Sequence, residues 1–296
     1  MEREGTISQA SKNKGRLKIV LGFTLLYLIV EVIGGIMTKS LALLADAGHM
    51  LTDVGGLALA LIAINYAERK ATAERTYGYY RAEILAALAN AVVLIGISIY
   101  ILYEAYLRFL NPPEVQSKEM VIVAAVGLLV NVAGMVILRK SSGESLNMKG
   151  AYFEVLSDML TSIGVIAAGV IMLTTGWYYA DPLLSAGIGL FILPRTWILL
   201  KESIGVLLEG TPKEVNMAEL RSSVLGVEGV QDMHDLHVWV LTSGVNAMTA
   251  HIVLKEGASG KQVLSALQNQ VTANFKITHT TFQLEEPGFE EEQTHL

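Results

Sequence analysis

Long apolar segments separated by short polar connections make up the chain as far as residue 210. A helix needs about 20 apolar residues to cross about 30 Å of hydrocarbon. Six segments meet this length, at residues 17–37, 41–66, 82–110, 120–138, 151–174 and 182–208. Several are longer than the bilayer requires, so tilted helices are expected. The pattern predicts a polytopic α-helical membrane protein with six transmembrane helices.

From residue 211 the pattern becomes that of a small soluble domain. Residues 212–226 and 259–275 have apolar positions at helical spacing, and Ser259 is typical of a helix start. Residues 230–242, 246–256 and 276–286 are β-rich and partly alternating, and a short Ser-Gly connection joins the first two as a hairpin. We therefore predict a tail over 1–16, a membrane domain over 17–210, an αββαβ domain over 211–286 and an acidic tail over 287–296.

Basic residues cluster in alternate connections and predict the orientation. The basic side carries Arg3, Lys12, Lys14, Arg16, Lys18, Arg69, Lys70, Arg75, Arg81, Arg139, Lys140 and Lys149. The other side carries Lys39, Arg108 and Lys118. Because connections rich in Lys and Arg stay in the cytoplasm, both termini are expected there. The C-terminal domain is then cytoplasmic.

Composition narrows the functional class. The chain is 52% hydrophobic and only 17% charged, with a net charge of -6 and no cysteine. Disulfides and thiolate metal sites are excluded, and the acidic balance argues against nucleic acid as a partner. The sequence contains neither a Gly-rich phosphate loop nor an H-E-x-x-H motif. ATP-driven transport and a zinc-protease activity therefore have no support, and we do not expect an enzyme.

Two pairs of metal-ligating side chains lie inside the apolar segments. His49 and Asp53 are four residues apart in the second segment, and Glu154 and Asp158 repeat this spacing in the fifth. Residues four apart share one helix face. Ionisable groups within a bilayer are costly and mark functional sites. One imidazole and three carboxylates brought together would form a four-ligand site for a divalent cation.

This ligand set suits Zn²⁺ and also admits harder ions such as Mn²⁺ or Fe²⁺. Metal binding needs a neutral imidazole and ionised carboxylates, so protons compete with the metal. That competition would couple metal export to proton uptake. Asp46 and Glu31, which also lie within the apolar segments, are candidates for the path of the proton or the metal.

The chain resembles the cation diffusion facilitators, a family of divalent metal/proton antiporters, and in particular the zinc-transporting branch. "SLALLADAGHMLTDVGGLALAL", "TYGYYRAEILAALANA", "DPLLSAGIGLFIL", "ESIGVLLEGTP" and "MHDLHVWVLTSGVNAMTAHIVL" carry the resemblance in the expected order, which covers residues 16–286. It implies six helices, a homodimer in the membrane and a metallochaperone-like, ferredoxin-like cytoplasmic domain. It also implies a transport site at His49, Asp53, Glu154 and Asp158.

The sequence departs from the family at the fifth segment. The zinc branch usually has His-x-x-x-Asp there, whereas this chain has "EVLSD", so Glu154 replaces an imidazole. A harder, more negative site follows, and Cd²⁺, Co²⁺, Mn²⁺ and Fe²⁺ join Zn²⁺ as expected substrates. The connection between the second and third segments lacks histidine, and Tyr80 stands where a His is common. We expect no metal site in that connection.

In the cytoplasmic domain, the resemblance implies a regulatory metal site at His234, His251 and His279, one on each predicted strand, with Glu285 as the acidic partner. His237 is three residues from His234, so strand alternation predicts that it lies on the opposite face.

The resemblance also implies an opposite-charge pair near the membrane at the dimer contact, for which Arg81 and Glu209 are the candidates. These observations favour a proton-coupled antiporter that exports Zn²⁺ or similar cations from the cytoplasm, across a bacterial plasma membrane. The alternative is a membrane metal sensor that signals through its cytoplasmic domain.

Overall fold

The computed structural model describes residues 3–67, 72–139, 146–242 and 244–289 of the chain. Within these ranges it describes all side chains except those of residues 3–20, 53, 56–67, 139 and 146–154. The chain forms two compact units, one of Met1–Leu61 with Ala87–Leu200 and one of Ile62–Ala86 with Lys201–Leu296.

The membrane helices are α1 (Arg3–Thr38), α2 (Leu41–Ala67), α3 (Arg81–Leu110), α4 (Ser117–Arg139), α5 (Leu146–Thr175) and α6 (Ala180–Leu207). In the described part of the chain, five of these six are long and apolar enough to cross a membrane, and the described apolar stretch of α2 is the shorter Leu41–Thr52. The prediction of six apolar helices is confirmed. The polar residues 3–16, expected as a tail, continue α1 without a break.

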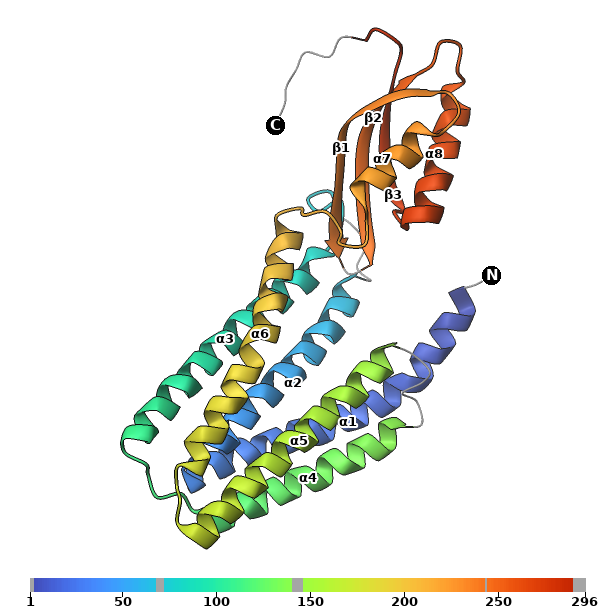
Figure 1. Ribbon diagram of the computed structural model, residues 1–296. Coiled ribbons are helices and arrows are strands. Elements are labelled where there is room, and N and C mark those ends of the chain that lie inside the picture. Colours follow the sequence, from blue (N-terminus) through green and yellow to red (C-terminus); the bar gives the residue numbers. More distant parts are fainter. Residues whose placement is uncertain (1–2, 68–71, 140–145, 243, 290–296) are drawn as a thin grey trace. The chain divides into compact units, whose positions relative to one another are not determined.

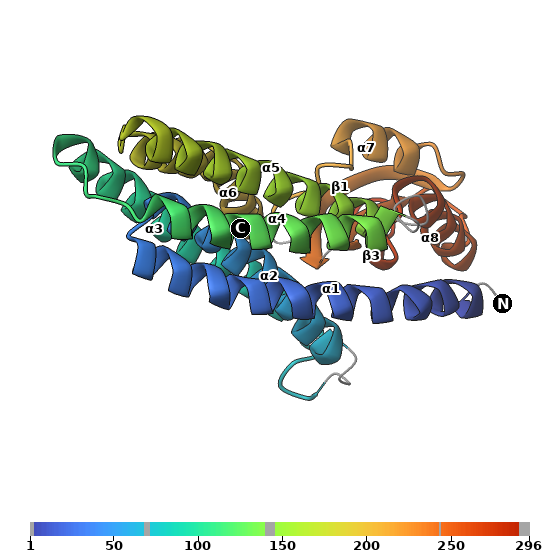
Figure 2. The same ribbon diagram turned by 90° about the horizontal axis from the view of Figure 1, so that it is seen from below.

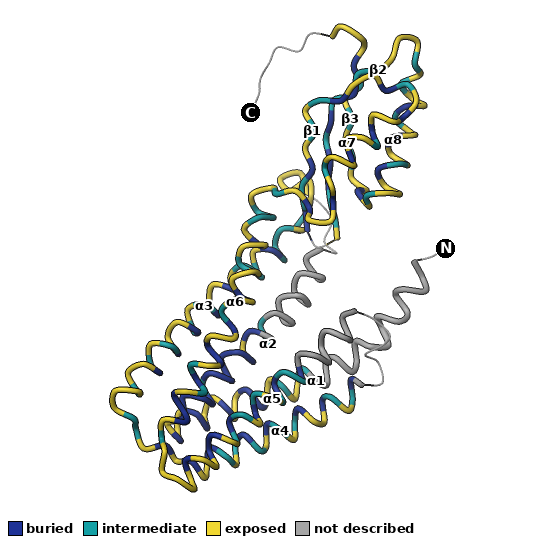
Figure 3. The backbone as a smooth tube through the Cα atoms, viewed as in Figure 1, coloured by how far each residue is buried: buried dark blue, intermediate teal, exposed yellow. Residues whose placement is uncertain are grey.

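The first unit is built from helices that bury one face and expose another. Helices α1, α4 and α5 run alongside one another in both views of the chain (Figures 1 and 2). Gly127 on α4 makes a close approach possible, because a Cβ there would collide with the Tyr27 ring of α1. Nearly all positions of α2 from Leu41 to Thr52 are buried (Figure 3). Large apolar side chains face outward, including Leu129 and Phe191 at 70% and 71% exposure, as expected for contact with lipid.

The second unit contains the αββαβ domain, with α7 (Met217–Leu225), β1 (Val230–Thr242), β2 (Val245–Leu254), α8 (Gly260–Phe275) and β3 (His279–Glu285). The predicted order of helices and strands is confirmed. The sheet order is β1-β2-β3, with β1 antiparallel and β3 parallel to β2. Asn216 begins α7 by accepting hydrogen bonds from the backbone N–H groups of Ala218 and Glu219.

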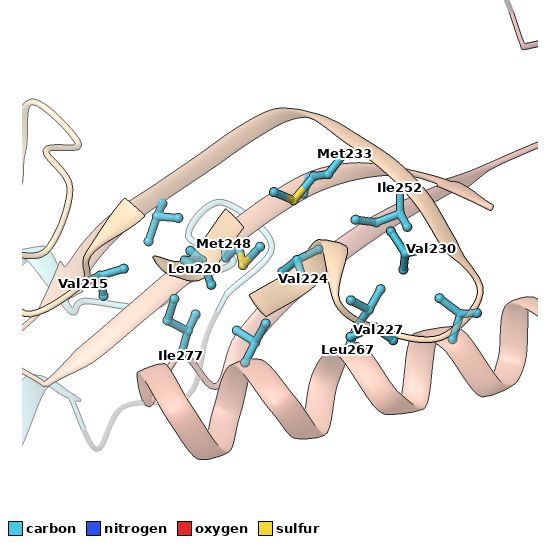
Figure 4. Packing of buried hydrophobic residues seen from close by; sticks show 14 residues of the cluster. Val215, Leu220, Val224, Val227, Val230, Met233, Met248, Ile252, Leu267 and Ile277 are labelled. Atoms are coloured by element: carbon cyan, nitrogen blue, oxygen red, sulfur yellow. The ribbon is translucent and has the colours of Figure 1, made fainter. Parts of the chain in front are cut away.

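Both helices of this domain cover the same face of the sheet (Figure 1). Their apolar residues, such as Leu220 and Leu267, meet Met233, Met248 and Ile252 of the strands in one closed core (Figure 4). The uncovered face carries several polar side chains, including Thr249, His251 and Gln283. The domain therefore has a hydrophobic core of its own and a free sheet face on which a polar site can form.

A β-bulge in β1 changes which residues reach that free face. His234 pairs with His251, and His237 pairs with Thr249, so three steps along β1 match two steps along β2. Asp235, within the bulge, has a positive φ of 50°. The extra residue resets the alternation, and His237 lies on the same face as His234. The prediction of opposite faces is wrong for this reason.

Candidate metal centres

His49 on α2 and Asp158 on α5 face each other inside the first unit. His49 Nε2 lies 3.9 Å from Asp158 Oδ1, and both residues are buried, at 7% and 4% exposure. The sequence put these side chains on separate helices, and the fold brings them together. At this separation a metal ion could bind both groups after a small adjustment, since metal–nitrogen and metal–oxygen bonds are about 2.0–2.2 Å long.

The other two predicted ligands belong to the same helices. Asp53 lies in α2 and Glu154 in α5, each four residues from its predicted partner. Their side chains fall outside the described residues. The pairing of His49 with Asp158 means that one turn of α2 and one turn of α5 come close together at this depth.

A second group of buried polar side chains lies beside this pair. Glu31 on α1 and Asp46 on α2 are 0% and 2% exposed, and their carboxyl groups are near enough to interact electrostatically. Tyr27 donates a hydrogen bond of 3.0 Å to Glu31 Oε1. Glu31 is also near enough to Asp158 to interact electrostatically, so the two acidic side chains lie in the neighbourhood of the ligand pair.

In the second unit, His234, His251 and Glu285 converge on the free face of the sheet. His234 Nε2 lies 2.9 Å from Glu285 Oε2, and His251 Nδ1 lies 3.0 Å from Glu285 Oε1. One ligand atom from each residue lies within 4.8 Å of the others, which is the spacing that a metal ion needs. Neighbouring strands β1 and β2 supply the histidines, and the end of β3 supplies the carboxylate.

The electrostatics of Glu285 match a cation-binding role. Burial by itself raises the pKa of this carboxyl, but hydrogen bonds from His234 and Gln283 and the charges of His234 and His251 outweigh it. The net effect holds the pKa of Glu285 below its ordinary value. The carboxylate is therefore kept ionised and available for a metal ion.

His279 is not part of this cluster. It lies at the start of β3 opposite Ala247, whereas Glu285 ends the strand opposite Val253. Its ring instead contacts Tyr77 edge-on at a centroid distance of 5.4 Å. Because the strand is extended, six residues place it about 20 Å from Glu285. The structure thus separates His279 from the other three predicted ligands.

Sequence reasoning missed two neighbours of the cluster. Gln283 donates a hydrogen bond of 3.0 Å to Glu285 Oε1. Asp235 lies 2.9 Å from His237 Nε2 and 3.7 Å from His251 Nε2. Gln283 could have been found from its spacing of two before Glu285 on a strand. Asp235 depends on the bulge, which has no simple sequence signal.

The predicted charge pair forms within one chain. Arg81 Nη2 lies 2.9 Å from Glu209 Oε1, with side-chain exposures of 37% and 63%. Close by in the same unit, Thr242 donates a hydrogen bond of 2.6 Å to Glu83 Oε2. An exposed ion pair such as Arg81–Glu209 contributes about 0.2–1 kcal/mol to the free energy of unfolding. The Arg81–Glu209 pair joins the beginning of α3 to the second residue after α6.

Comparison with known proteins agrees with this architecture. Residues 17–208 match the family model described as the cation efflux transmembrane domain. Residues 212–287 match the cytoplasmic domain of cation efflux proteins, whose model is named for dimer formation.

Relatives of similar length match along nearly the whole chain. The metal cation efflux system protein CzcD of Cupriavidus metallidurans is 51% identical, over 92% of this chain and 87% of its own. The cadmium, cobalt and zinc/H(+)-K(+) antiporter of Bacillus subtilis is 42% identical, over 92% and 90%. The zinc transporter ZitB of Yersinia pestis is 40% identical, over 95% and 90%.

Among solved structures, the metal-bound C-terminal domain of the CzcD transporter is 39% identical, covering 24% of this chain and 99% of that one, with a TM-score of 0.23. The two family matches together span both units, and the relatives are named for metal cation efflux. The chain belongs to the cation efflux family, also called the cation diffusion facilitators, and is a membrane protein that functions in divalent metal cation efflux.

Proposed function

We propose that this protein is a secondary antiporter that exports divalent transition-metal cations in exchange for protons. Its transport site consists of His49, Asp53, Glu154 and Asp158. The observation that carries the proposal is the buried contact between His49 on α2 and Asp158 on α5. A carboxylate in such a place is costly unless a cation neutralises it.

The exchange follows from the chemistry of the ligands. A metal ion binds the neutral imidazole and the ionised carboxylates, whereas protonation of either group opposes binding. A site that takes the metal from one side and protons from the other therefore moves the two in opposite directions. Glu31 and Asp46, next to the site and close to each other, are suited to carry the proton, and the Tyr27 hydroxyl holds Glu31 in place.

We infer export from the cytoplasm across a bacterial plasma membrane, with both termini cytoplasmic, as the distribution of Lys and Arg indicates. The ion is Zn²⁺ first, with Cd²⁺ and Co²⁺ as further substrates, in line with the names of the relatives. Glu154 in place of a histidine extends the range toward Mn²⁺ and Fe²⁺. The protein acts as a homodimer, and cytosolic metal at His234, His251 and Glu285 regulates it.

Flux of metal into proteoliposomes under an imposed pH gradient tests the proposal. Wild-type protein should move Zn²⁺ with a pH change of the opposite sense, and Asp158→Asn should abolish the flux because the site loses a charged ligand. Glu119→Gln, an exposed carboxyl at the start of α4, is the matched control and should transport normally.

A competition series with Zn²⁺, Cd²⁺, Co²⁺, Mn²⁺ and Fe²⁺ measures the selectivity.

The alternative function is a membrane metal sensor, which the cluster at His234, His251 and Glu285 by itself would serve equally well. Metal binding by wild-type protein without any flux would favour the sensor. Normal flux in Asp158→Asn would reject the proposed transport site.

A further inference from the structure

The first turn of α2 is capped by a side chain from another helix. Ser40 occupies the N-cap position, and its Oγ accepts a hydrogen bond of 3.2 Å from Leu43 N. The N–H groups of Leu41 and Ala42 instead donate to the two carboxylate oxygens of Asp181, at 2.9 and 3.1 Å. Asp181 lies in the first turn of α6. The start of α2 is therefore satisfied jointly by its own serine and by α6.

Asp181 is completely buried, at 0% exposure, and its charge is balanced by donors. Ser40 Oγ donates to it at 2.7 Å, and Arg108 Nη1 on α3 lies 3.4 Å from Oδ2. The N-terminus of a helix carries a partial positive charge, which adds to this balance. The carboxylate thus depends on α2 and α3 for its neutralisation, just as α2 depends on it for capping.

Arg108 joins Asp181 to the backbone before α2, and Ser40, Asp181 and Arg108 together are called the capping node below. Its Nη1 donates a hydrogen bond of 2.6 Å to the carbonyl oxygen of Lys39, and its Nε donates to Glu104 at 3.1 Å. Lys39 has a positive φ of 58°, which turns the chain sharply from α1 into α2. Three helices are consequently tied at one point, and apolar side chains of α2, α3 and α6 pack against one another beside it: Leu41, Ala45, Leu94, Ile101, Ala105, Ile188 and Ile192.

The capping node controls the direction in which α2 runs. His49 and Asp53 follow Leu41 by eight and twelve residues, which places them about 12 and 18 Å along the helix axis. A tilt of α2 by about 3° at its capped end would move Asp53 by about 1 Å, twice the tolerance of about 0.5 Å for a preorganised site. Small errors at Asp181 are therefore amplified at the ligands.

We propose that Asp181 is a positioning residue for metal transport, which fixes the N-terminal end of α2 to α3 and α6 and so holds His49 and Asp53 against Asp158. This inference rests on the proposed transport site at these residues. The residue Leu41 that Asp181 caps lies about two helical turns before His49 on α2, so Asp181 acts on the ligands only through the helix.

The test compares Asp181→Asn with Glu104→Gln in purified, reconstituted protein. Asparagine keeps the shape but turns one acceptor oxygen into an NH2 group, so an N–H of Leu41 or Ala42 loses its partner. We expect KM for Zn²⁺ flux to rise about 10- to 100-fold, as when the support of a metal ligand is lost. The pH midpoint of transport should not move, because Asp181 takes no part in the exchange. Glu104→Gln, which touches Arg108 but not α2, should keep the wild-type KM.

Hydrogen exchange provides a readout that needs no transport. The amides of residues 41 and 42 should exchange about ten-fold faster in Asp181→Asn and at the wild-type rate in Glu104→Gln. Ser40→Ala, which removes a smaller part of the cap, should show the same effects to a lesser degree, and it serves if Asp181→Asn does not fold.

The outcomes separate this inference from the proposed function. Absence of flux in wild-type protein would reject the transport function, while hydrogen exchange would still test the cap. Wild-type flux together with an unchanged KM in Asp181→Asn would overturn the positioning role, even if exchange became faster. A shifted pH midpoint without a change in KM would also overturn it, because Asp181 would then be a proton-carrying group.

Discussion

Replacing Glu285 with glutamine should weaken the cytoplasmic domain even when no metal is bound. The buried carboxylate accepts hydrogen bonds from His234 at 2.9 Å and from Gln283 at 3.0 Å, and His251 Nδ1 lies 3.0 Å from its Oε1 as an ion pair. A glutamine keeps one acceptor oxygen and presents an NH2 group to the other partner. One of the two charge-assisted hydrogen bonds is lost, the other becomes a neutral bond, and the ion pair with His251 disappears.

The magnitude follows from the strength and exposure of these bonds. Hydrogen bonds to charged groups contribute about 1.5–3 kcal/mol and neutral ones about 0.5–1.5 kcal/mol. The His234 side chain is 43% exposed, so water weakens the contribution of its hydrogen bond to stability. We expect a loss of about 2 kcal/mol in the free energy of unfolding. For a domain of this size, that lowers the melting temperature by about 8–16 °C.

The effect should depend on pH in one direction. The pKa of Glu285 is lowered in the folded domain, so its contribution is present above the unfolded-state pKa and is lost as the pH falls through the folded-state pKa. A protonated glutamate also resembles glutamine. The difference between wild type and Glu285→Gln should therefore be full above about pH 5 and should shrink below about pH 4.

Thermal unfolding of residues 211–289, followed by circular dichroism in EDTA, measures this difference. This segment has its own hydrophobic core. Glu286→Gln, which changes an exposed neighbour, is the control and should have the melting temperature of the wild type. Titration with Zn²⁺ in the absence of EDTA should show an affinity at least about 100-fold lower for Glu285→Gln, since the site loses its only charged ligand. Equal melting temperatures for the two variants at pH 7, or a difference that grows toward acid, would refute the reasoning.

Two further predictions concern the two metal centres. Asp235→Ala should lower the affinity of the cytoplasmic domain for Zn²⁺ about 10- to 100-fold, because His251 loses the carboxylate that faces its Nε2; an unchanged affinity by isothermal titration would show that Asp235 does not orient the ring. Glu154→His should narrow transport toward Zn²⁺ by making the site softer and less negative. A flux series in which wild type and this variant prefer the same ions would contradict a role for Glu154 in selectivity.

Features with a strong local signal were predictable from the sequence. The apolar segments gave the helices, and the spacing of His49 with Asp53 pointed to the face of α2 that meets Asp158. The αββαβ order followed from periodicity alone. These features depend on repeated patterns over ten or more residues, which tertiary contacts reinforce rather than override.

Features that depend on pairing between distant segments were not predictable. The bulge at Asp235 puts His237 on an unexpected face, because the alternation of a strand is counted against its neighbour and not along its own sequence. His279 lies on β3 like Glu285, and only the register of β2 with β3, which puts it opposite Ala247, shows that it is far from His251. Asp181 stands just before the predicted sixth segment, and no local pattern shows that its carboxylate caps α2.

The cap shared by α2 and α6 has a consequence for the order in which the protein is made. Asp181 accepts hydrogen bonds from N–H groups that lie 140 and 139 residues earlier in the chain. The ribosome therefore adds Asp181 long after it has added the residues of α2. Until then the N–H groups of Leu41 and Ala42 lack the carboxylate that caps them. The cap at the start of α2 is therefore completed only after α6, the last of the six membrane helices, has been made.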